Sequence, residues 1–311
     1  MSTQRILIAL IAGASSAALF VALFAQALPV FPFLMLVPLP ISIVGLGWGS
    51  ITGFIAALFA FIGISLLSSP LNGLFFSALF SLPMAYLAHL TGLTRQDNAN
   101  QTVEWFPEST ILWRTIIVGG VIIGLTFIIF GFNAEQITQQ VIGHFATELE
   151  KIDETSRNII ETHLAFHVRH SPYSMPMIWF FVMALNLWLG IWIAKKSELF
   201  ARPSFRLANA ELHGAVMLVF FFAFIVSRFF PPFSLIGSAF VGIVAMAFIM
   251  LGLNTIHIIT SHLKVRGLLL TSFYLATFLL FFPIIIIVLG VGFADHFLKI
   301  RQRYRLAHPN I

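Results

Sequence analysis

The sequence has no cysteine and very little charge. The absence of cysteine excludes disulfide bonds, thiol nucleophiles and cysteine metal sites. Charged residues make up 9% of the 311 residues, hydrophobic residues make up 59%, and the mean hydropathy is +0.96. A water-soluble domain of this size cannot hide so much apolar surface from solvent. The composition therefore predicts a polytopic membrane protein without a sizeable soluble domain.

Motifs of the common enzyme classes are also missing. The chain contains no phosphate-binding P-loop, nucleophile elbow, dinucleotide fingerprint or pair of intramembrane aspartates. Ionisable residues, which an intramembrane enzyme needs at mid-depth, are rare in the apolar segments. We therefore expect neither catalysis nor a bound cofactor. The net charge of +5 comes from short basic loops rather than from a patch that would bind nucleic acid, so no nucleic-acid partner is expected.

Long apolar runs are what the sequence has instead. A helix of about 20 residues crosses a bilayer, so the runs predict an all-α transmembrane bundle of about 8–9 segments. The predicted spans are 6–28, 30–47, 50–67, 71–91, 111–132, 173–194, 211–230, 233–253 and 267–291. The loop 92–110 is expected to be a polar connection.

The basic residues of the short loops predict a cytoplasmic N-terminus. Nine crossings would then place the basic tail 298–305 outside, so we expect Pro283 to break the last segment. Asp295 is expected to pair with Lys299, one helical turn later. The tail itself is expected to contact anionic lipid.

The stretch 133–172 is too polar to span a membrane. Its apolar residues recur at helical spacing, so we expect one or two amphipathic helices outside the bilayer, facing the periplasm or the exterior. His163, His167 and His170 follow one another at i, i+4 and i+7, which places three imidazoles on one helical face. This face is either a solvated surface or a site for zinc or pH sensing.

Small residues recur at helical spacing in several apolar segments. One small-residue face consists of Ala14, Ala18 and Ala22, and a second consists of Gly49, Gly53 and Ala57. Gly45 lies one turn before the second face. Such faces let helix backbones approach closely in lipid, where hydrophobicity alone gives little association. Two interpretations stay open: packing within this chain, and docking of another membrane protein.

Pro38 and Pro40 predict a broken helix, because each proline removes a helical hydrogen bond and the two are not expected to lie together inside an unbroken helix. The glycines that follow favour a short helix over 41–47, joined abruptly to a long one. Irregular backbone at membrane depth persists only where it is buried in protein or lines a cavity. We therefore expect a substrate site near Pro38, Pro40 and Trp48. Asn186, in the middle of a later span, is either its polar contact or a residue that joins two helices.

Two family resemblances follow from these residues. The run P-L-P-I-S-I-V-G-L-G-W-G-S-I-T-G resembles the second and third helices of the substrate-binding S components of energy-coupling-factor transporters. The alanine face at 14–22 is similar to the one with which those proteins dock on a coupling subunit. In the C-terminal half, N-L-W-L-G (186–190), F-R-L-A-N (205–209) and L-G-V-G-F-A-D-H-F-L-K-I-R-Q-R (289–303) are similar to features of the DUF2232 or YybS-like membrane proteins. Neither resemblance implies a substrate.

The resemblances imply one integral membrane domain over 1–311. Within it, 1–194 would be an S-component-like core of six segments that includes the loop 133–172, and 195–311 would add further spans and the basic tail. The implied location is the bacterial cytoplasmic (inner) membrane, crossed many times. The implied function is that of a transport-class component, which binds an unknown small molecule and works with a coupling subunit and an ATPase because the chain lacks an ATP-binding motif. The alternative is a non-transport membrane scaffold, or a regulatory or assembly protein, that acts through helix–helix contacts. The expected partners are membrane lipids and other membrane subunits.

Overall fold

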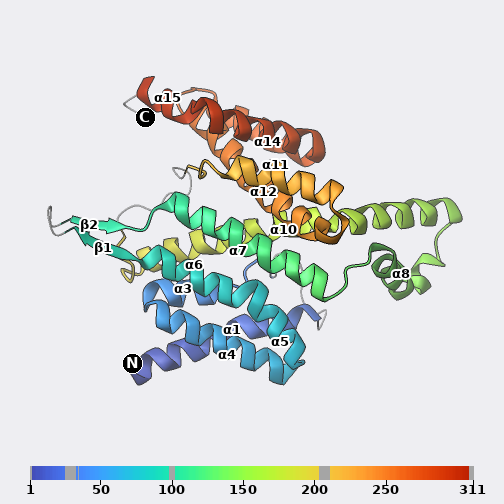
Figure 1. Cartoon of the computed structure of the whole chain (residues 1–311), viewed down its shortest axis with the longest axis horizontal. Coiled ribbons are helices and arrows are strands. Elements are labelled where there is room, and N and C mark those ends of the chain that lie inside the picture. Colours follow the sequence, from blue (N-terminus) through green and yellow to red (C-terminus); the bar gives the residue numbers. More distant parts are fainter. Residues whose placement is uncertain (1, 25–32, 34, 98–101, 203–210, 308–311) are drawn as a thin grey trace.

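The computed structural model describes residues 2–24, 33, 35–97, 102–202 and 211–307, and helices make up most of them (Figure 1). Within these residues, seven helices are long and apolar enough to cross a membrane, and two further apolar helices, Val216–Phe229 and Arg266–Leu279, are shorter. The predicted helical architecture is therefore confirmed. The loop 92–110, expected to be a polar connection, contains an antiparallel hairpin of β1 (Thr94–Asp97) and β2 (Thr102–Trp105).

The helices follow in chain order. The first set is α1 (Thr3–Phe24), α3 (Leu39–Gly47), α4 (Ser50–Leu67), α5 (Pro70–Phe76), α6 (Leu82–Gly92) and α7 (Glu108–Ile129), with a π-helical turn Ser77–Ser81 between α5 and α6. The second set is α8 (Ala134–His144), α9 (Ala146–Leu149), α10 (Glu154–Lys196), α11 (Val216–Phe229), α12 (Ser234–Ile259), α13 (Arg266–Leu279), α14 (Phe281–Leu298) and α15 (Ile300–Ala307).

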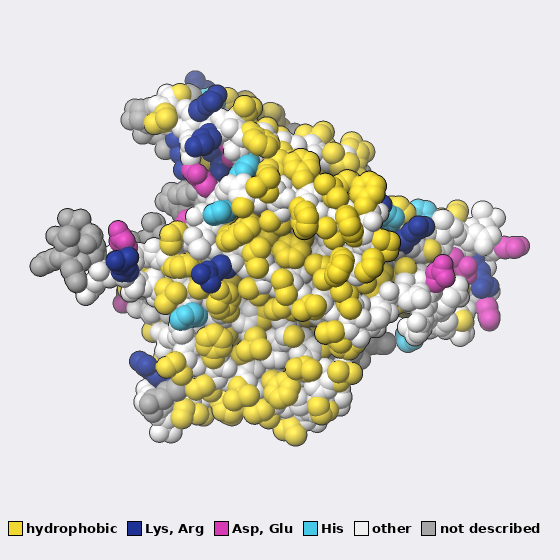
Figure 2. Space-filling model, viewed as in Figure 1, with side chains coloured by type: hydrophobic (Ala, Val, Ile, Leu, Met, Phe, Trp, Pro, Cys, Tyr) yellow, Lys and Arg dark blue, Asp and Glu magenta, His cyan; other side chains and the backbone are white. Residues whose placement is uncertain are grey.

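The centre of the bundle is formed by α10 and α12. α10 packs against α3, α7 and α12, while α12 also packs against α7, α11 and α14 (Figure 1). Phe180 and Met183 of α10 and Ile243 and Phe248 of α12 are among the largest buried side chains. Apolar side chains also cover the outside of the bundle between its two ends (Figure 2). Extended exposed apolar surface of this kind is typical of a surface that faces lipid or a partner.

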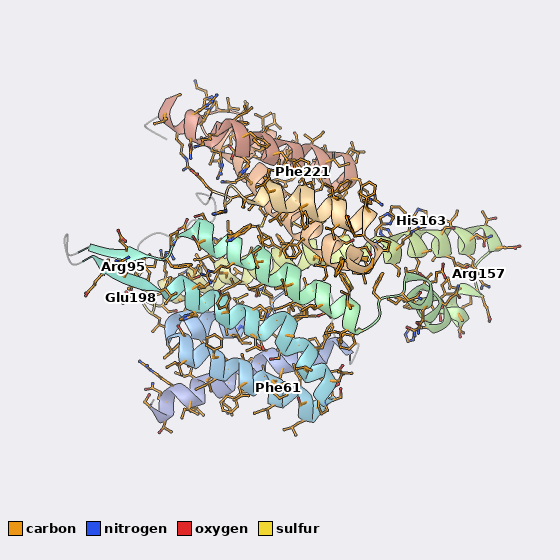
Figure 3. The ribbon with its side chains drawn as sticks, viewed as in Figure 1. Phe61, Arg95, Arg157, His163, Glu198 and Phe221 are labelled. Carbon is orange, nitrogen blue, oxygen red and sulfur yellow. The ribbon has the colours of Figure 1, made fainter. Side chains whose placement is uncertain are left out.

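α10 is longer than the sequence predicts. A boundary was expected between the polar stretch 133–172 and the span 173–194, but α10 continues through it, with Pro172 and Pro176 inside the helix. Its 43 residues extend for about 65 Å at 1.5 Å per residue, about twice the thickness of the hydrocarbon layer. The first half of α10, which carries Arg157 and His163, therefore projects beyond the bundle beside α8 (Figures 1 and 3).

The last predicted span is divided at Leu280 into α13 and α14. The expected break is therefore confirmed, and Pro283 lies in the first turn of α14, where a proline is tolerated. As a result the N- and C-terminal ends of the chain lie at the same end of the bundle (Figure 1). At this end α15 bonds to Glu211, just before α11, and to His262, just after α12.

Candidate functional site

One buried face of α10 meets the two irregular segments of the N-terminal part of the chain. Trp179 and Asn186 lie two turns apart on this face, and Gly190 follows one turn later. All three are buried. The face therefore places an indole N–H and a primary amide inside the bundle.

The first irregular segment is the π-helical turn Ser77–Ser81. Pro83 has no N–H, so the carbonyl of Leu79, four residues earlier, lacks its usual helical donor. The indole Nε1 of Trp179 donates to this oxygen at 2.5 Å. The sequence reasoning did not single out Trp179 or this turn, although Pro83 was the signal for a freed carbonyl. Turns of this kind inside α-helices are frequent at functional sites.

The second irregular segment is the turn that leads into α3. The N–H of Leu39 bonds to Leu36 O at 3.0 Å, which leaves the carbonyl of Met35 without that donor. Nδ2 of Asn186 donates to Met35 O at 2.6 Å and to Val182 O at 2.7 Å. The prediction that Asn186 joins two segments is therefore confirmed, and both of its N–H groups are used.

Two buried oxygen atoms lie where α10 meets α3 and the turn before it. The amide Oδ1 of Asn186 and the hydroxyl Oγ of Ser42 are buried, and neither has a hydrogen-bond partner within the described residues. Ser42 lies on α3 directly against α10, because a Cβ added at Gly190 would collide with its Oγ. A buried polar atom without a partner costs about 1–3 kcal/mol. Each such atom in a folded protein therefore calls for an explanation, and a hydrogen-bonding ligand is one.

The predicted break around Pro38 and Pro40 is confirmed. α3 has nine residues, with Pro38 buried at its start and Pro40 in its first turn. Gly49 has a φ of 98° and joins α3 abruptly to α4. Trp48 is half-buried at the other end of α3, about 13 Å along the helix axis. The prolines and Trp48 therefore bracket α3 and do not converge on one point.

The second small-residue face packs inside the chain. A Cβ added at Gly53 would lie 2.8 Å from the Cα of Gly45, and one added at Gly45 would lie 2.8 Å from the Cβ of Ala88 on α6. Ala57 is fully buried. Packing within the chain is therefore confirmed for Gly45, Gly53 and Ala57. Gly49 is an exception, because nothing lies within 4 Å of its added Cβ and its role is the positive φ of the turn.

The alanine face of α1 points the other way. α1 packs on α4 through Gly13, where an added Cβ would lie 2.5 Å from Ala56 O. Ala14 and Ala18 are exposed and Ala22 is half-buried. The face predicted for docking thus lies on the outside of the described bundle, and docking of another protein on it stays a prediction.

The three histidines of α10 do not form a metal site. His163, His167 and His170 are exposed on the projecting half of the helix. Nδ1 of His163 and of His170 each lie within 2.8 Å of a carbonyl one turn earlier, at Ile159 and Phe166. Within the part of the chain that the structure describes, no group of three or more His, Cys, Asp or Glu side chains could hold a metal ion. The metal interpretation is therefore corrected in favour of a solvated helix face.

Arg202, which the sequence marked only as a basic loop residue, is buried at the end of the bundle that holds the termini. Its guanidinium donates to Thr91 O at 3.2 Å and Phe106 O at 3.1 Å, and lies 3.7 Å from a carboxylate oxygen of Glu108. Burial lowers the pKa of Arg202 from its ordinary value, and the negative charge of Glu108 opposes this. A guanidinium stays protonated even so. Arg202 therefore fixes the chain after α10 to the end of α6, to the residue that follows β2 and to α7.

The described residues form a helical bundle whose long apolar helices are compatible with a membrane protein, and irregular backbone is buried against one long helix. Comparison with models of protein families, with curated proteins and with solved structures finds no match. Function is therefore argued from the geometry at α3 and α10.

Proposed function

We propose that this chain is an integral membrane protein of the transport class that binds a small molecule where α3 meets α10. The observation that carries the proposal is the pair of buried oxygens, Asn186 Oδ1 and Ser42 Oγ, which have no partner within the described residues. A ligand that donates hydrogen bonds to both would remove the cost of burying them. Such placement of a few polar groups among apolar side chains is typical of small-molecule sites.

The surroundings favour an uncharged ligand. Within the described residues, the buried polar side chains of α1, α3, α4 and α10 are hydroxyls, the amide of Asn186 and the indole of Trp179, and none of them is charged. A charged group buried there would lack a counter-charge, and the cost of leaving it unpaired is large. We therefore propose a neutral ligand with hydroxyl or N–H donors.

The setting of the site is proposed to be the bacterial inner membrane, with both ends of the chain in the cytoplasm. The basic residues Lys195, Lys264 and Arg303 lie in or beside connections at the end that holds the termini, as the positive-inside rule requires. The resemblance to S components supports a core in 1–194 that works with a coupling subunit and an ATPase. The exposed Ala14 and Ala18 offer the contact for such a subunit.

Small molecules that copurify with the protein provide the test. The tagged chain is purified from its native membrane in mild detergent, and bound molecules are extracted and identified by mass spectrometry. We expect one neutral compound to be enriched with the unaltered protein and lost in Ser42→Ala. Because the Ser42 hydroxyl has no partner in the described structure, its removal should not weaken folding.

The matched control is Ser16→Ala, which removes from α1 another buried hydroxyl that has no partner among the described residues. This variant should keep the compound. Equal small-molecule profiles for all three proteins would contradict a ligand at α3 and α10.

The alternative is a scaffold that acts through protein contacts alone. It is favoured by apolar side chains exposed on the projecting helices, among them Phe145, Ile159 and Phe166. The same purification separates the two functions, because a scaffold would retain other membrane or envelope proteins and lose them in Ala18→Leu while carrying no enriched compound.

A further inference from the structure

The C-terminal helix α15 is fixed to the bundle by a buried ion pair. Asp295 was expected to pair with Lys299, but this is wrong: Lys299 has a φ of 50° and ends α14. Asp295 instead accepts from the main-chain N of Arg301 at 2.8 Å and from its Nε at 2.7 Å. Both side chains are nearly inaccessible, with 2% and 8% exposed. Removing one partner of such a buried pair is strongly destabilising, because it leaves the other charge buried without its partner.

Further bonds set which face of α15 looks inward. Gln302 donates to Glu211, and Tyr304 bonds to His262. Residues 301, 302 and 304 therefore face the bundle. Arg303 and Leu306, which are neighbours at i and i+3, are exposed on the other side, and 83% of Leu306 is accessible.

The exposed side of this corner combines positive charge with apolar surface. Lys299, Arg303 and Arg305 are exposed. Lys264, in the connection after His262, and Arg266, the first residue of α13, are exposed as well. Basic side chains gather at this end of the molecule (Figure 2). Phe297 and Leu298, where α14 ends, are 64% and 52% exposed. This corner therefore lies where the apolar helices end and exposed basic residues follow.

We propose that α15 is an interfacial helix that binds the headgroups of anionic phospholipids. Its position at the end of the apolar bundle places it at the level of the headgroups, where Leu306 and Phe297 reach the acyl chains and the arginines meet phosphates. Anionic lipid attracts basic residues close to the surface, and the attraction falls off within a Debye length. The buried pair Asp295–Arg301 holds α15 in this orientation. The inference rests on the proposal that the chain is embedded in a bilayer.

A single fluorescent label tests the inference, because the chain has no cysteine of its own. Leu306→Cys carries an environment-sensitive dye, and the full chain is placed in nanodiscs of phosphatidylcholine alone or with phosphatidylglycerol. We expect the emission to shift to the blue only with the anionic lipid and to return at high salt. Arg303→Gln and Arg305→Gln should each lower the fraction of molecules with Leu306 inserted in the membrane by about fivefold. Asp295→Asn should abolish the shift even though all five exposed basic residues remain.

Two controls give the outcomes their meaning. Glu150→Cys, exposed at the opposite end of the bundle, should report no difference between the two lipids. Inorganic phosphate should not reverse the shift if lipid, rather than a free anion, is the ligand. Equal emission from Leu306→Cys in both lipids would overturn this inference alone, whereas a chain that does not enter nanodiscs would overturn the membrane proposal as well.

Discussion

The N-terminal block (α1, α3, α4, α5 and α6) and the C-terminal block (α13, α14 and α15) are joined to the centre of the bundle in different ways. In the N-terminal block, side chains of α10 donate to main-chain carbonyls, and helix backbones touch at Gly45 and Gly53. In the C-terminal block, α13 buries no residue and α14 buries only three. The C-terminal block contacts α12 mainly through the close approach of Gly252 to Gly292.

The difference shows how this helical bundle stabilises irregular backbone. The carbonyls of Met35 and Leu79 are without their usual helical donors, and a buried carbonyl without a donor is costly. Both carbonyls accept hydrogen bonds from α10, because Asn186 lies opposite Met35 and Trp179 lies opposite Leu79. The helices of the C-terminal block are regular where they meet α12, so their carbonyls need no side-chain donors. Close glycine contacts are then enough to hold this block against α12. We therefore expect substitutions in the first block to affect the whole bundle, and those in the second to act locally.

The largest effect is expected from Gly53→Leu. An added Cβ would already lie 2.8 Å from the backbone of Gly45, so α3 and α4 must separate. We expect the free energy of unfolding to fall by about 3 kcal/mol or more, measured by thermal or denaturant unfolding in detergent. Gly290→Leu is the control, because nothing lies within 4 Å of its added Cβ. Equal stability of the two variants would remove the contrast between tightly and loosely packed glycines.

Gly292→Leu should have a smaller, local effect. An added Cβ there would collide with the carbonyl of Phe248 on α12. We expect α14 to separate from α12 at a cost of about 1–3 kcal/mol, with faster hydrogen exchange over residues 266–307 and none of this change in α3 or α4. Faster exchange spread evenly over both blocks would show that the two are not independent.

Trp179→Phe tests whether the indole N–H stabilises the irregular backbone of the N-terminal block. The substitution keeps most of the ring but removes the N–H that satisfies Leu79 O, so the free energy of unfolding should fall by about 1–2 kcal/mol. Trp188→Phe on the exposed side of α10 is the control and should change little.

A double-mutant cycle identifies the cause. Pro83→Ala restores an N–H four residues after Leu79, so Trp179→Phe should cost less in that background. If the two changes are simply additive, the freed carbonyl is not what Trp179 stabilises.

Local sequence rules predicted part of this arrangement. They placed the break near Pro38, the close packing of Gly53, a cross-segment partner for Asn186 and the division near Pro283, because each of these follows from the chemistry of one residue. They failed where the partner is distant in sequence. Trp179 and Leu79 are 100 residues apart, and Arg202 lies 111 residues from Thr91.

The pairing of Asp295 failed for a different reason. The i, i+4 rule assumes a continuing helix, but Lys299 takes a left-handed conformation that ends α14, and the main chain then brings Arg301 back to the carboxylate. Periodicity also gave no sign that α10 continues through Pro172 and Pro176. The unpaired oxygens of Asn186 and Ser42 depend on the whole packing of α3 against α10, so no local pattern indicates them.

The smallest effect is expected where α10 begins, outside both blocks. Asp153 caps this helix by accepting from the main-chain N of Ser156 at 2.9 Å. Hydrogen bonds from Ser156 lower the pKa of Asp153 from its ordinary value. Because the folded pKa is below the unfolded one, the cap stabilises α10 above about pH 4 and is lost as the pH falls through the folded pKa.

Acidification should therefore fray only the first turn of α10. Hydrogen exchange of residues 154–158, corrected for its intrinsic pH dependence, should rise below about pH 4, while Asp153→Asn keeps the cap without a charge and should show no such rise. Exchange at Gly53 and Trp179 should not change over this range, because the projecting half of α10 frays without disturbing the half that holds the N-terminal block. If acid loosened both halves together, α10 would transmit changes at its exposed end to the contact between Asn186 and α3.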